Sequence, residues 1–450
     1  MGVTGHPRVK TSAWKWSVCG LLLLASAINY MDRQTLSNAA VRITTQFDLR
    51  QEQYGNMELV FGWAFALGST LFGIAVDRVS VRWLYPVVLT LWSVVGFATG
   101  LVHSYGGLLL CRTFLGLFEG GHWPCAVKTT QLLLEPRDRA MGNGVLQSGA
   151  SIGAIATPLI MNAMLTSQLD SWRMPFQVVG AAGLFWVVFW LVLVRKNDLR
   201  MSANEPSAEC GVRSAESDAL PTNPVAAPVP IPSAESAGVP GAPPEGAGWR
   251  LFFGRRMLVL FFVVACINTC WQILRAWLPK FLQQGRGYAE HDVLNFTSLY
   301  YVATDIGCLG AGALTLWLAR RGKDVYASRA SVFFACTLLS ALTIAAALLP
   351  KGFPLLGVLL LVGAGTLGAF PIYHAFTQDI SAEHQGKVTG ITGVAAWILS
   401  SPASKFFGRL VDRTGSFDVG FAIAGCLPLL AFLALILWWN DGRSTKPAPW

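Results

Sequence analysis

Among the ionisable residues within the long apolar stretches of this sequence, where charged side chains are rare, five are the most informative. They are Asp32 and Arg33, Arg112 and Glu119, and Arg275. A charge at membrane depth is costly unless it is paired or faces water, so each of these residues is a functional candidate. With one carboxyl group protonated, three cations and two carboxylates leave a net positive charge. Such a set of side chains suits the binding of an organic anion.

The spacing of these residues predicts that they meet. Arg112 and Glu119 are seven residues apart, which is nearly two helical turns, so both face the same side of one helix. Counting at about 1.5 Å per residue places Asp32, Arg112 and Arg275 at a similar depth and Glu119 near the middle of the membrane. We therefore expect one cluster.

The alternative is that these charges only pair with one another and have a structural role. Asp32 would then pair with Arg112, and Glu119 with His122 or a backbone carbonyl. The presence of all five on helices expected to line a cavity favours the functional interpretation.

Other polar residues in the apolar stretches have simpler interpretations. Lys128 and Lys405 are expected to extend towards lipid headgroups, and Glu58 is expected at the membrane interface. The GxxxG motif at Gly149–Gly153 predicts close helix packing. Gln147 is expected to face the cavity and to hydrogen-bond a hydroxyl or carboxylate.

Composition excludes several classes of protein. Of 450 residues, 53% are hydrophobic and 13% are charged, about half the charged fraction of an average soluble protein, which excludes a soluble globular enzyme. The net charge is +9, but the basic residues cluster between apolar runs, so nucleic acid is not an expected partner. The scattered cysteines predict neither disulfides nor a zinc site. The sequence lacks P-loop, HExxH and GxSxG motifs, so no cofactor, nucleotide-driven pump or hydrolase is implied.

Twelve apolar segments are long enough to cross a bilayer, for which about 20 residues are needed. The first six are Trp16–Leu36, Met57–Val76, Trp83–Val102, Gly107–Gln131, Met141–Leu165 and Pro175–Val194. The second six are Met257–Lys280, Leu294–Leu318, Tyr326–Leu349, Phe353–Gln378, Val388–Gly408 and Val419–Asn440. The sequence therefore predicts an all-α integral membrane protein.

The loops predict orientation and domains. Lys and Arg are more frequent on the side of the N-terminus, and the number of spans is even, so both termini are expected in the cytoplasm. Residues 196–250 are rich in Pro, Ala, Ser and Gly and are expected to form a disordered cytoplasmic linker. The expected domains are an N-terminal tail (1–15), a six-helix bundle (16–195), this linker, a second six-helix bundle (251–440) and a C-terminal tail (441–450).

The two halves share a weak repeat. Gly73, Asp77 and Arg78 follow the second span, and Arg320 and Arg321 follow the eighth. Charged turns at matched positions indicate duplicated halves that rock about a midplane site. We expect these turns to lock the halves together on the cytoplasmic side, as a gate.

Motifs along nearly the whole chain resemble a known family. They are Asn29-Tyr30-Met31-Asp32-Arg33, Gly73-xxx-Asp77-Arg78, Cys111-Arg112-xxx-Leu115-Gly116-xx-Glu119-Gly120-xxx-Pro124, Ser148-Gly149-xxx-Gly153-xxxx-Pro158, Trp277-Leu278-Pro279-Lys280 and Leu410-Val411-Asp412-x-Thr414-Gly415-Ser416. The sequence resembles the major facilitator superfamily, and within it the anion:cation symporter family, which includes hexuronate and galactonate transporters and the sialin-type group. The resemblance implies the major facilitator fold of two six-helix bundles.

The resemblance also implies roles for individual residues. Asp32 and Glu119 would be the proton-coupling carboxylates. Arg33, with Tyr30 and Gln147, would contact the carboxylate and hydroxyl groups of the substrate. Arg112 would pair with a carboxylate and transmit its protonation to the substrate site. The sequence departs from sugar-acid members in having Phe65 instead of a tyrosine, Val394-Ala395-Ala396-Trp397 in span eleven, and the additional substrate-binding cation Arg275.

The expected function is secondary active transport. We expect a monomer in the cell membrane that carries a small organic anion, a sugar acid or other carboxylate, into the cell with H⁺ or Na⁺ by alternating access. One alternative is an exporter or antiporter of a drug or metabolite. A membrane-embedded enzyme is the third interpretation, and it has the least support because the one long loop is of low complexity.

Overall fold

The computed structural model describes residues 11–135, 138–195, 198–199, 254–378, 380 and 385–439, and their regular secondary structure is entirely helical. The first half contains α1 (Ser12–Gln46), α2 (Gln51–Arg78), α3 (Val81–Thr99), α4 (Tyr105–Glu119), α5 (His122–Leu133), α6 (Arg139–Met164), η1 (Leu169–Trp172) and α7 (Arg173–Leu193). The second half contains α9 (Arg255–Lys280), η2 (Phe281–Gly285), α10 (Glu290–Arg320), α11 (Val325–Ala341), α12 (Thr343–Leu348), α13 (Phe353–Gln378), α14 (Gln385–Thr414) and α15 (Asp418–Trp438). The expected linker, apart from residues 198–199, and the tail at 441–450 lie outside the described residues.

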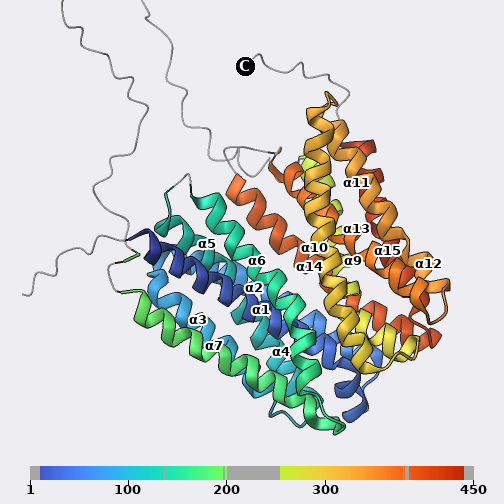
Figure 1. Cartoon of the computed structure of the whole chain (residues 1–450), viewed down its shortest axis with the longest axis horizontal. Helices are drawn as coiled ribbons and strands as arrows, with labels where there is room; N and C mark the ends of the chain where they lie inside the picture. The colour runs from blue at the N-terminus through green and yellow to red at the C-terminus, as the bar shows by residue number, and fades with distance from the viewer. Residues whose placement is uncertain are drawn as a thin grey trace, which may run out of the picture.

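The helices form two bundles, one from each half of the chain. Figure 1 shows α1–α7 on one side and α9–α15 on the other. The bundles meet mainly through α2 with α14, α6 with α10, and α1 with α9. This architecture confirms the expected division into two helical halves.

Hydrogen bonds and ion pairs join the bundles at the end of the molecule where α1 ends and α2 begins. Where α1 ends and α2 begins, the backbone N–H groups of Gln51 and Glu52 donate to Asp412 of α14 at 2.9 and 2.8 Å. We call this the closed end. The opposite end, where α1 and α9 begin, is the open end, and the bundles lie apart there in Figure 1. In the predicted orientation the open end faces the cytoplasm.

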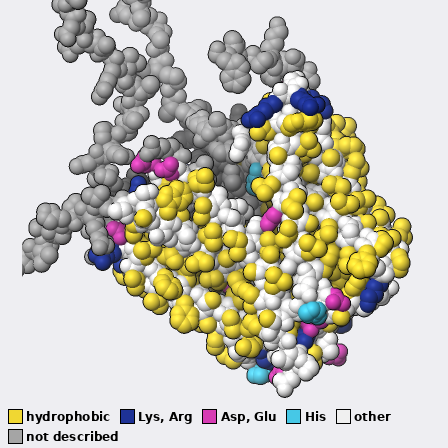
Figure 2. All heavy atoms as spheres, in the orientation of Figure 1, with side chains coloured by type: hydrophobic (Ala, Val, Ile, Leu, Met, Phe, Trp, Pro, Cys, Tyr) yellow, Lys and Arg dark blue, Asp and Glu magenta, His cyan; other side chains and the backbone are white. Residues whose placement is uncertain are grey.

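The apolar surface fits a membrane. Among the described residues, nine helices or pairs of consecutive helices are long and apolar enough to cross a bilayer. The remaining predicted spans correspond to α1 and α14, which carry more polar side chains, and to α4 and α5, each of which is too short by itself, so the count of twelve stays a prediction. Figure 2 shows hydrophobic side chains over most of the flanks of both bundles, with charged side chains mainly towards the two ends.

Several predicted spans differ in length or continuity from the helices observed. The first span was expected to end at Leu36, but α1 continues to Gln46. Its last turns are polar, yet Ser37, Asn38 and Thr44 are buried against other helices, which hydropathy alone does not detect. The predicted span Gly107–Gln131 is divided into α4 and α5 by Gly120 and Gly121.

The prediction that Gly149 and Gly153 serve helix packing is confirmed. A Cβ atom on Gly149 would overlap the carbonyl oxygen of Leu23 in α1, and one on Gly153 would overlap that of Ala27. Only glycine permits so close an approach of α6 to α1. This contact holds α1, which carries Asp32 and Arg33, at a fixed register against α6.

Candidate functional site

The buried charged residues form two clusters that α4 connects. Glu119 lies at the break after α4, and Arg112 lies two turns, about 10 Å, nearer the closed end. We call Asn29, Arg33 and Glu119 the Glu119 cluster, and Glu58, Arg112 and Arg275 the Glu58 cluster.

The Glu119 cluster joins α1 to α4. Arg33 Nε donates to Glu119 Oε2 at 2.8 Å, and Asn29 Nδ2 donates to the same oxygen at 3.2 Å. All three side chains are buried. The alternative pairing of Glu119 with His122 is wrong, because the His122 ring instead lies in hydrogen-bond contact with Ser26 Oγ at 2.9 Å and the Tyr85 hydroxyl at 3.0 Å.

Aromatic rings surround the guanidinium of Arg33. Its central carbon lies 4.6 Å from the ring centroid of Phe65, 5.4 Å from Trp397, and 5.5 Å from both Tyr30 and Phe61. These contacts are cation–π interactions, which strengthen when water is excluded. Trp397 belongs to α14, so the environment of Arg33 is built from both bundles. Two positions noted as departures from the sugar-acid pattern, Phe65 and Trp397, therefore both lie beside Arg33.

Asp32 lies on another face of α1. Its side chain approaches α3, where a Cβ atom added to Gly96 would come 3.0 Å from Asp32 Oδ1. The carboxyl group is buried, and neither oxygen has a hydrogen-bond partner among the described residues. The alternative pairing of Asp32 with Arg112 is thus absent here, and Arg112 contacts Glu58 instead.

The Glu58 cluster contains the residue that sequence reasoning missed. Glu58 Oε1 lies 3.5 Å from Arg112 Nη2, and Glu58 Oε2 accepts a hydrogen bond from Arg275 Nη2. Arg275 Nε also donates to Gln272 Oε1 at 2.7 Å. The expectation of an interfacial Glu58 is wrong, because α2 begins at Gln51, which places Glu58 two turns inside the helix and leaves it 5% exposed.

The three arginines retain unused hydrogen-bond donors. Within the described part of the chain, Arg33 Nη2, Arg275 Nη1 and the side-chain nitrogens of Arg112 make no hydrogen bond, and the only ion-pair contact of Arg112 described is the 3.5 Å contact of Nη2 with Glu58. These atoms are buried. A buried donor without an acceptor is unfavourable by about 1–3 kcal/mol. An anion with several oxygen atoms would satisfy such donors.

Gln147 is not close to Arg33 in this conformation. Gly149 packs on Leu23 and Gly153 on Ala27, so the registers of α1 and α6 are fixed relative to each other. Arg33 then lies about twelve residues, or about 18 Å, nearer the closed end than Gln147. The expected substrate contact of Gln147 stays a prediction.

The five residues predicted to form the cytoplasmic gate lie at the open end of α2 and α10: Gly73, Asp77, Arg78, Arg320 and Arg321. Asp77 pairs with Lys128 of the same bundle, with Nζ and Oδ1 2.9 Å apart. Arg321 stacks on Trp317 of its own helix at 3.9 Å. These interactions do not connect the bundles, as expected for an open end, and the gating role stays a prediction.

The two lysines expected at lipid headgroups lie in ion pairs instead. Lys128 has Asp77 as its partner, as described above. Lys405 of α14 lies 3.9 Å from Glu52 Oε1 of α2, a contact that Arg409 Nη2 shares at 2.6 Å. Lys405 therefore helps to hold the closed end.

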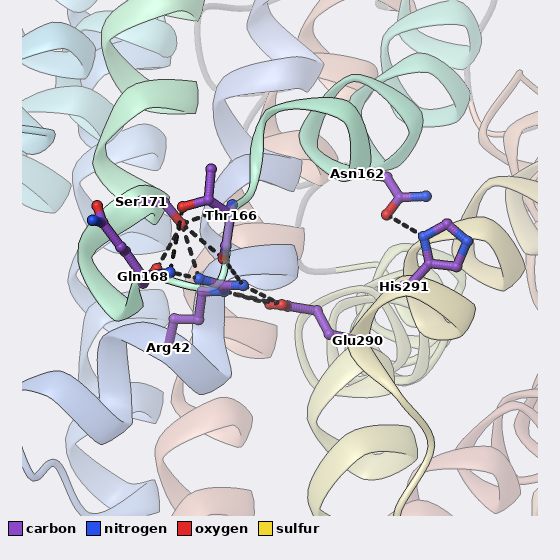
Figure 3. A network of polar contacts seen from close by, with 7 residues as sticks. All are labelled: Arg42, Asn162, Thr166, Gln168, Ser171, Glu290 and His291. Atoms are coloured by element: carbon purple, nitrogen blue, oxygen red, sulfur yellow. Dashed lines mark hydrogen bonds and ion pairs between the residues drawn. The ribbon is translucent and has the colours of Figure 1, made fainter.

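A second polar network joins the bundles at the closed end (Figure 3). Arg42 of α1 donates to Glu290 of α10 through Nε at 2.8 Å and through Nη2 at 2.6 Å. The same guanidinium donates to the carbonyl oxygens of Thr166 and Gln168 and to the hydroxyl of Ser171, all in its own bundle. Arg42 is thus held by its own bundle and presented to the other.

Solved structures share this fold. A bacterial homologue of the human lysosomal transporter Spinster superimposes with a TM-score of 0.74, at 16% identity over 97% of this chain and 100% of the other. A D-xylose–proton symporter gives a TM-score of 0.68, at 14% identity over 94% of this chain and 98% of the other. These identities are low, so the comparisons establish the fold alone.

Curated relatives match over nearly the whole chain. A probable sulfoacetate transporter of Cupriavidus necator is 26% identical over 93% of this chain and 92% of its own. A probable L-galactonate transporter of Escherichia coli is 27% identical over 92% and 87%, and a hexuronate transporter of Bacillus subtilis is 26% identical over 94% of both. These relatives are consistent with the anion:cation symporter group that the motifs resemble.

The fold and the relatives agree on one family. The relatives are transporters and the fold is that of transporters, so the predictions of a multi-pass membrane transporter and against an enzyme are confirmed. The model of the Major Facilitator Superfamily matches residues 22–404. This chain therefore belongs to the Major Facilitator Superfamily.

Proposed function

We propose that this transporter is a proton symporter that carries a small organic anion, such as a sugar acid, across the cell membrane into the cell. The observation that carries the proposal is the set of buried guanidinium groups with unused donors on α1, α4 and α9. Two relatives are named as transporters of L-galactonate and of hexuronates, which are carboxylates with several hydroxyl groups. Such anions offer acceptors for these donors.

The Glu119 cluster supplies a means of coupling to protons. Arg33 is bound to Glu119 in this structure. A proton on Glu119 would remove the charge of the carboxylate and weaken this ion pair, which frees Arg33 to bind the substrate. By linkage, substrate that binds Arg33 favours protonation of Glu119 to the same degree. Asp32, a buried carboxyl group without a hydrogen-bond partner in the described chain, is the second proposed proton carrier.

Alternating access follows from the two ends. The closed end is held by hydrogen bonds and ion pairs between bundles, whereas the open end lacks the equivalent bridge at Asp77. Both clusters include or contact a residue of the second bundle, Arg275 or Trp397. Rocking of the bundles therefore changes the site and its access together.

Transport in proteoliposomes tests the coupling. We expect uptake of labelled galactonate or glucuronate to be driven by a pH gradient with the outside acidic, and not by a Na⁺ gradient. Glu119→Gln should lower net uptake at least tenfold while exchange of substrate across the membrane continues. Asp170→Asn, which changes an exposed carboxylate of η1, is the matched control and should keep wild-type uptake.

Three outcomes would contradict the proposal. Full net uptake by Glu119→Gln would remove Glu119 from the coupling. Uptake driven by Na⁺ alone would assign another coupling ion. Accumulation of substrate inside the liposomes only when protons flow outward would identify an antiporter.

A further inference from the structure

The two clusters differ in their balance of charge. The Glu119 cluster has one arginine and one carboxylate, Arg33 and Glu119, in direct contact. The Glu58 cluster has one carboxylate, Glu58, between two arginines, Arg112 and Arg275. The second cluster thus has one positive charge in excess, and its three side chains are at most 5% exposed. Water therefore does little to screen this charge.

We propose that Glu58 is the charge selector of this transporter, which makes the site between Arg112 and Arg275 accept a substrate with one negative charge in preference to two. This inference rests on the proposed transport of organic anions. It adds the charge class of the substrate and a residue that sets it. Glu58 is part of no motif on which the family resemblance depends.

Among the described residues, the side chains that contact the Glu58 cluster directly are neutral, and Arg112 also interacts electrostatically with Glu119, which is paired with Arg33. Phe61 covers Arg112, with the guanidinium carbon 4.2 Å from the ring centroid. The hydroxyl of Tyr54 donates to the carbonyl of Ala276, and that of Tyr301 donates to Gln34. These neighbours are neutral, so within direct contact distance Glu58 and the two arginines set the local balance of charge.

Lys280 is the next cation along α9, but it faces elsewhere. Its ammonium group donates to Thr44 Oγ1 at 2.9 Å and lies 4.8 Å from the ring centroid of Tyr54. It lies five residues beyond Arg275, nearer the closed end. Lys280 thus belongs to the contact between α9 and α1 and does not complete the Glu58 cluster.

Glu58 also competes with the substrate for Arg275. Glu58 is on α2 and Arg275 is on α9, so opening of the closed end separates them. Gln272, one turn earlier on α9, keeps its hydrogen bond to Arg275 and holds the guanidinium in place. Glu58 keeps its contact with Arg112 of its own bundle, so an anion that enters from that end would take its place on Arg275 alone, and the return of Glu58 would displace one negative charge.

The test uses ligands that share one carbon chain and differ in charge. Galactitol is neutral, D-galactonate has one carboxylate and galactarate has two. Binding to purified transporter in lipid nanodiscs is measured by the ligand-induced shift in thermal unfolding and by competition. For the wild type we expect D-galactonate to bind at least tenfold more tightly than galactarate or galactitol.

Substitutions that change the net charge of the Glu58 cluster should then change which ligand binds most tightly. Glu58→Gln should reverse it, so that galactarate binds at least tenfold more tightly than D-galactonate. Glu58→Asp keeps the charge and should keep the wild-type order. The double variant Glu58→Gln/Arg275→Gln restores the excess of one positive charge and should restore the preference for D-galactonate. Arg275→Gln alone should weaken D-galactonate at least tenfold relative to galactitol.

Each result supports or overturns the inference. If Glu58→Gln does not fold, the double variant and Arg275→Gln decide. An unchanged order of ligands in the folded variants, or tighter binding of galactarate by the wild type, would refute charge selection while anion transport stands. If the wild type binds neither D-galactonate nor galactarate, and neither acetate nor sulfoacetate in a parallel comparison, the proposed anion transport is refuted, and the inference that depends on it is refuted as well.

Discussion

The ion pair between Arg42 and Glu290 should be a determinant of which end of the transporter is closed. Glu290→Gln keeps the size of the side chain but removes its charge. Arg42 retains its hydrogen bonds to Thr166, Gln168 and Ser171, so its own bundle still holds it in place (Figure 3). The substitution therefore removes an interaction between bundles and leaves those within the first bundle.

The size of the effect follows from geometry and exposure. Three hydrogen bonds, at 2.8, 3.0 and 2.6 Å, join the two charged groups, whose side chains are 14% and 24% exposed. Fully exposed ion pairs contribute about 0.2–1 kcal/mol, and hydrogen bonds to charged groups contribute about 1.5–3 kcal/mol. Because the pair is half-buried and glutamine retains one acceptor, we expect a loss of about 1–1.5 kcal/mol. This corresponds to about a five- to tenfold shift towards opening of this end.

Distances between spin labels measure that shift. Leu169 in η1 and Phe353 at the start of α13 are exposed, lie at the closed end, and belong to different bundles. After replacement of the nine native cysteines, labels at both positions should show a longer-distance population that grows five- to tenfold in Glu290→Gln. Asp418→Asn breaks a similar ion pair with Arg286, at 2.6 Å, within the second bundle, and should have no such effect. Equal distance distributions in Glu290→Gln and the wild type would refute the reasoning.

Two further substitutions test the packing of the helices and the shielding of Arg33. Gly149→Leu should lower the free energy of unfolding by about 1–3 kcal/mol, because its Cβ would overlap the carbonyl of Leu23, whereas Gly144→Leu, with open space at that position, should leave thermal unfolding nearly unchanged. Trp397→Ala removes one ring over Arg33 and should speed the modification of that guanidinium by phenylglyoxal, as followed by mass spectrometry, while Trp397→Phe should not. Equal unfolding temperatures of the two glycine variants, or unchanged modification of Arg33, would contradict these expectations.

Burial of the charged candidates could be predicted from the sequence, because a lone charge within an apolar stretch is a strong signal. Asp32, Arg33, Arg112, Glu119 and Arg275 are all buried as expected. The seven-residue spacing also indicated that α4 brings its arginine and its glutamate to one side. The two halves and the close packing at Gly149 and Gly153 followed from local patterns in the same way.

The partners of these charges could not be predicted, because they depend on how the helices pack. Glu58 lay at the edge of a hydropathy window, so its seven residues of preceding helix were not visible. The contact of Arg33 with Trp397 joins residues far apart in the sequence and requires both bundles. Without those distances, the sequence offers Asp32 as one alternative partner of Arg112 and does not indicate Glu58.

The two clusters together give a physical reason for coupling if both proposals hold. An anion on Arg275 excludes Glu58, and while Glu58 is excluded the closed end lacks one of its contacts between bundles. The anion can leave Arg275 for Arg33, whose partner Glu119 lies about two turns beyond Arg112 on α4, only when Glu119 has released that arginine. Release requires a proton on Glu119. A substrate without a proton therefore holds the entry end open, and a proton without a substrate leaves Arg33 without a counter-ion. Only a substrate and a proton together allow Glu58 to return to Arg275. The requirement for both arises because Glu58, Glu119 and the carboxylate of the substrate compete for Arg33 and Arg275.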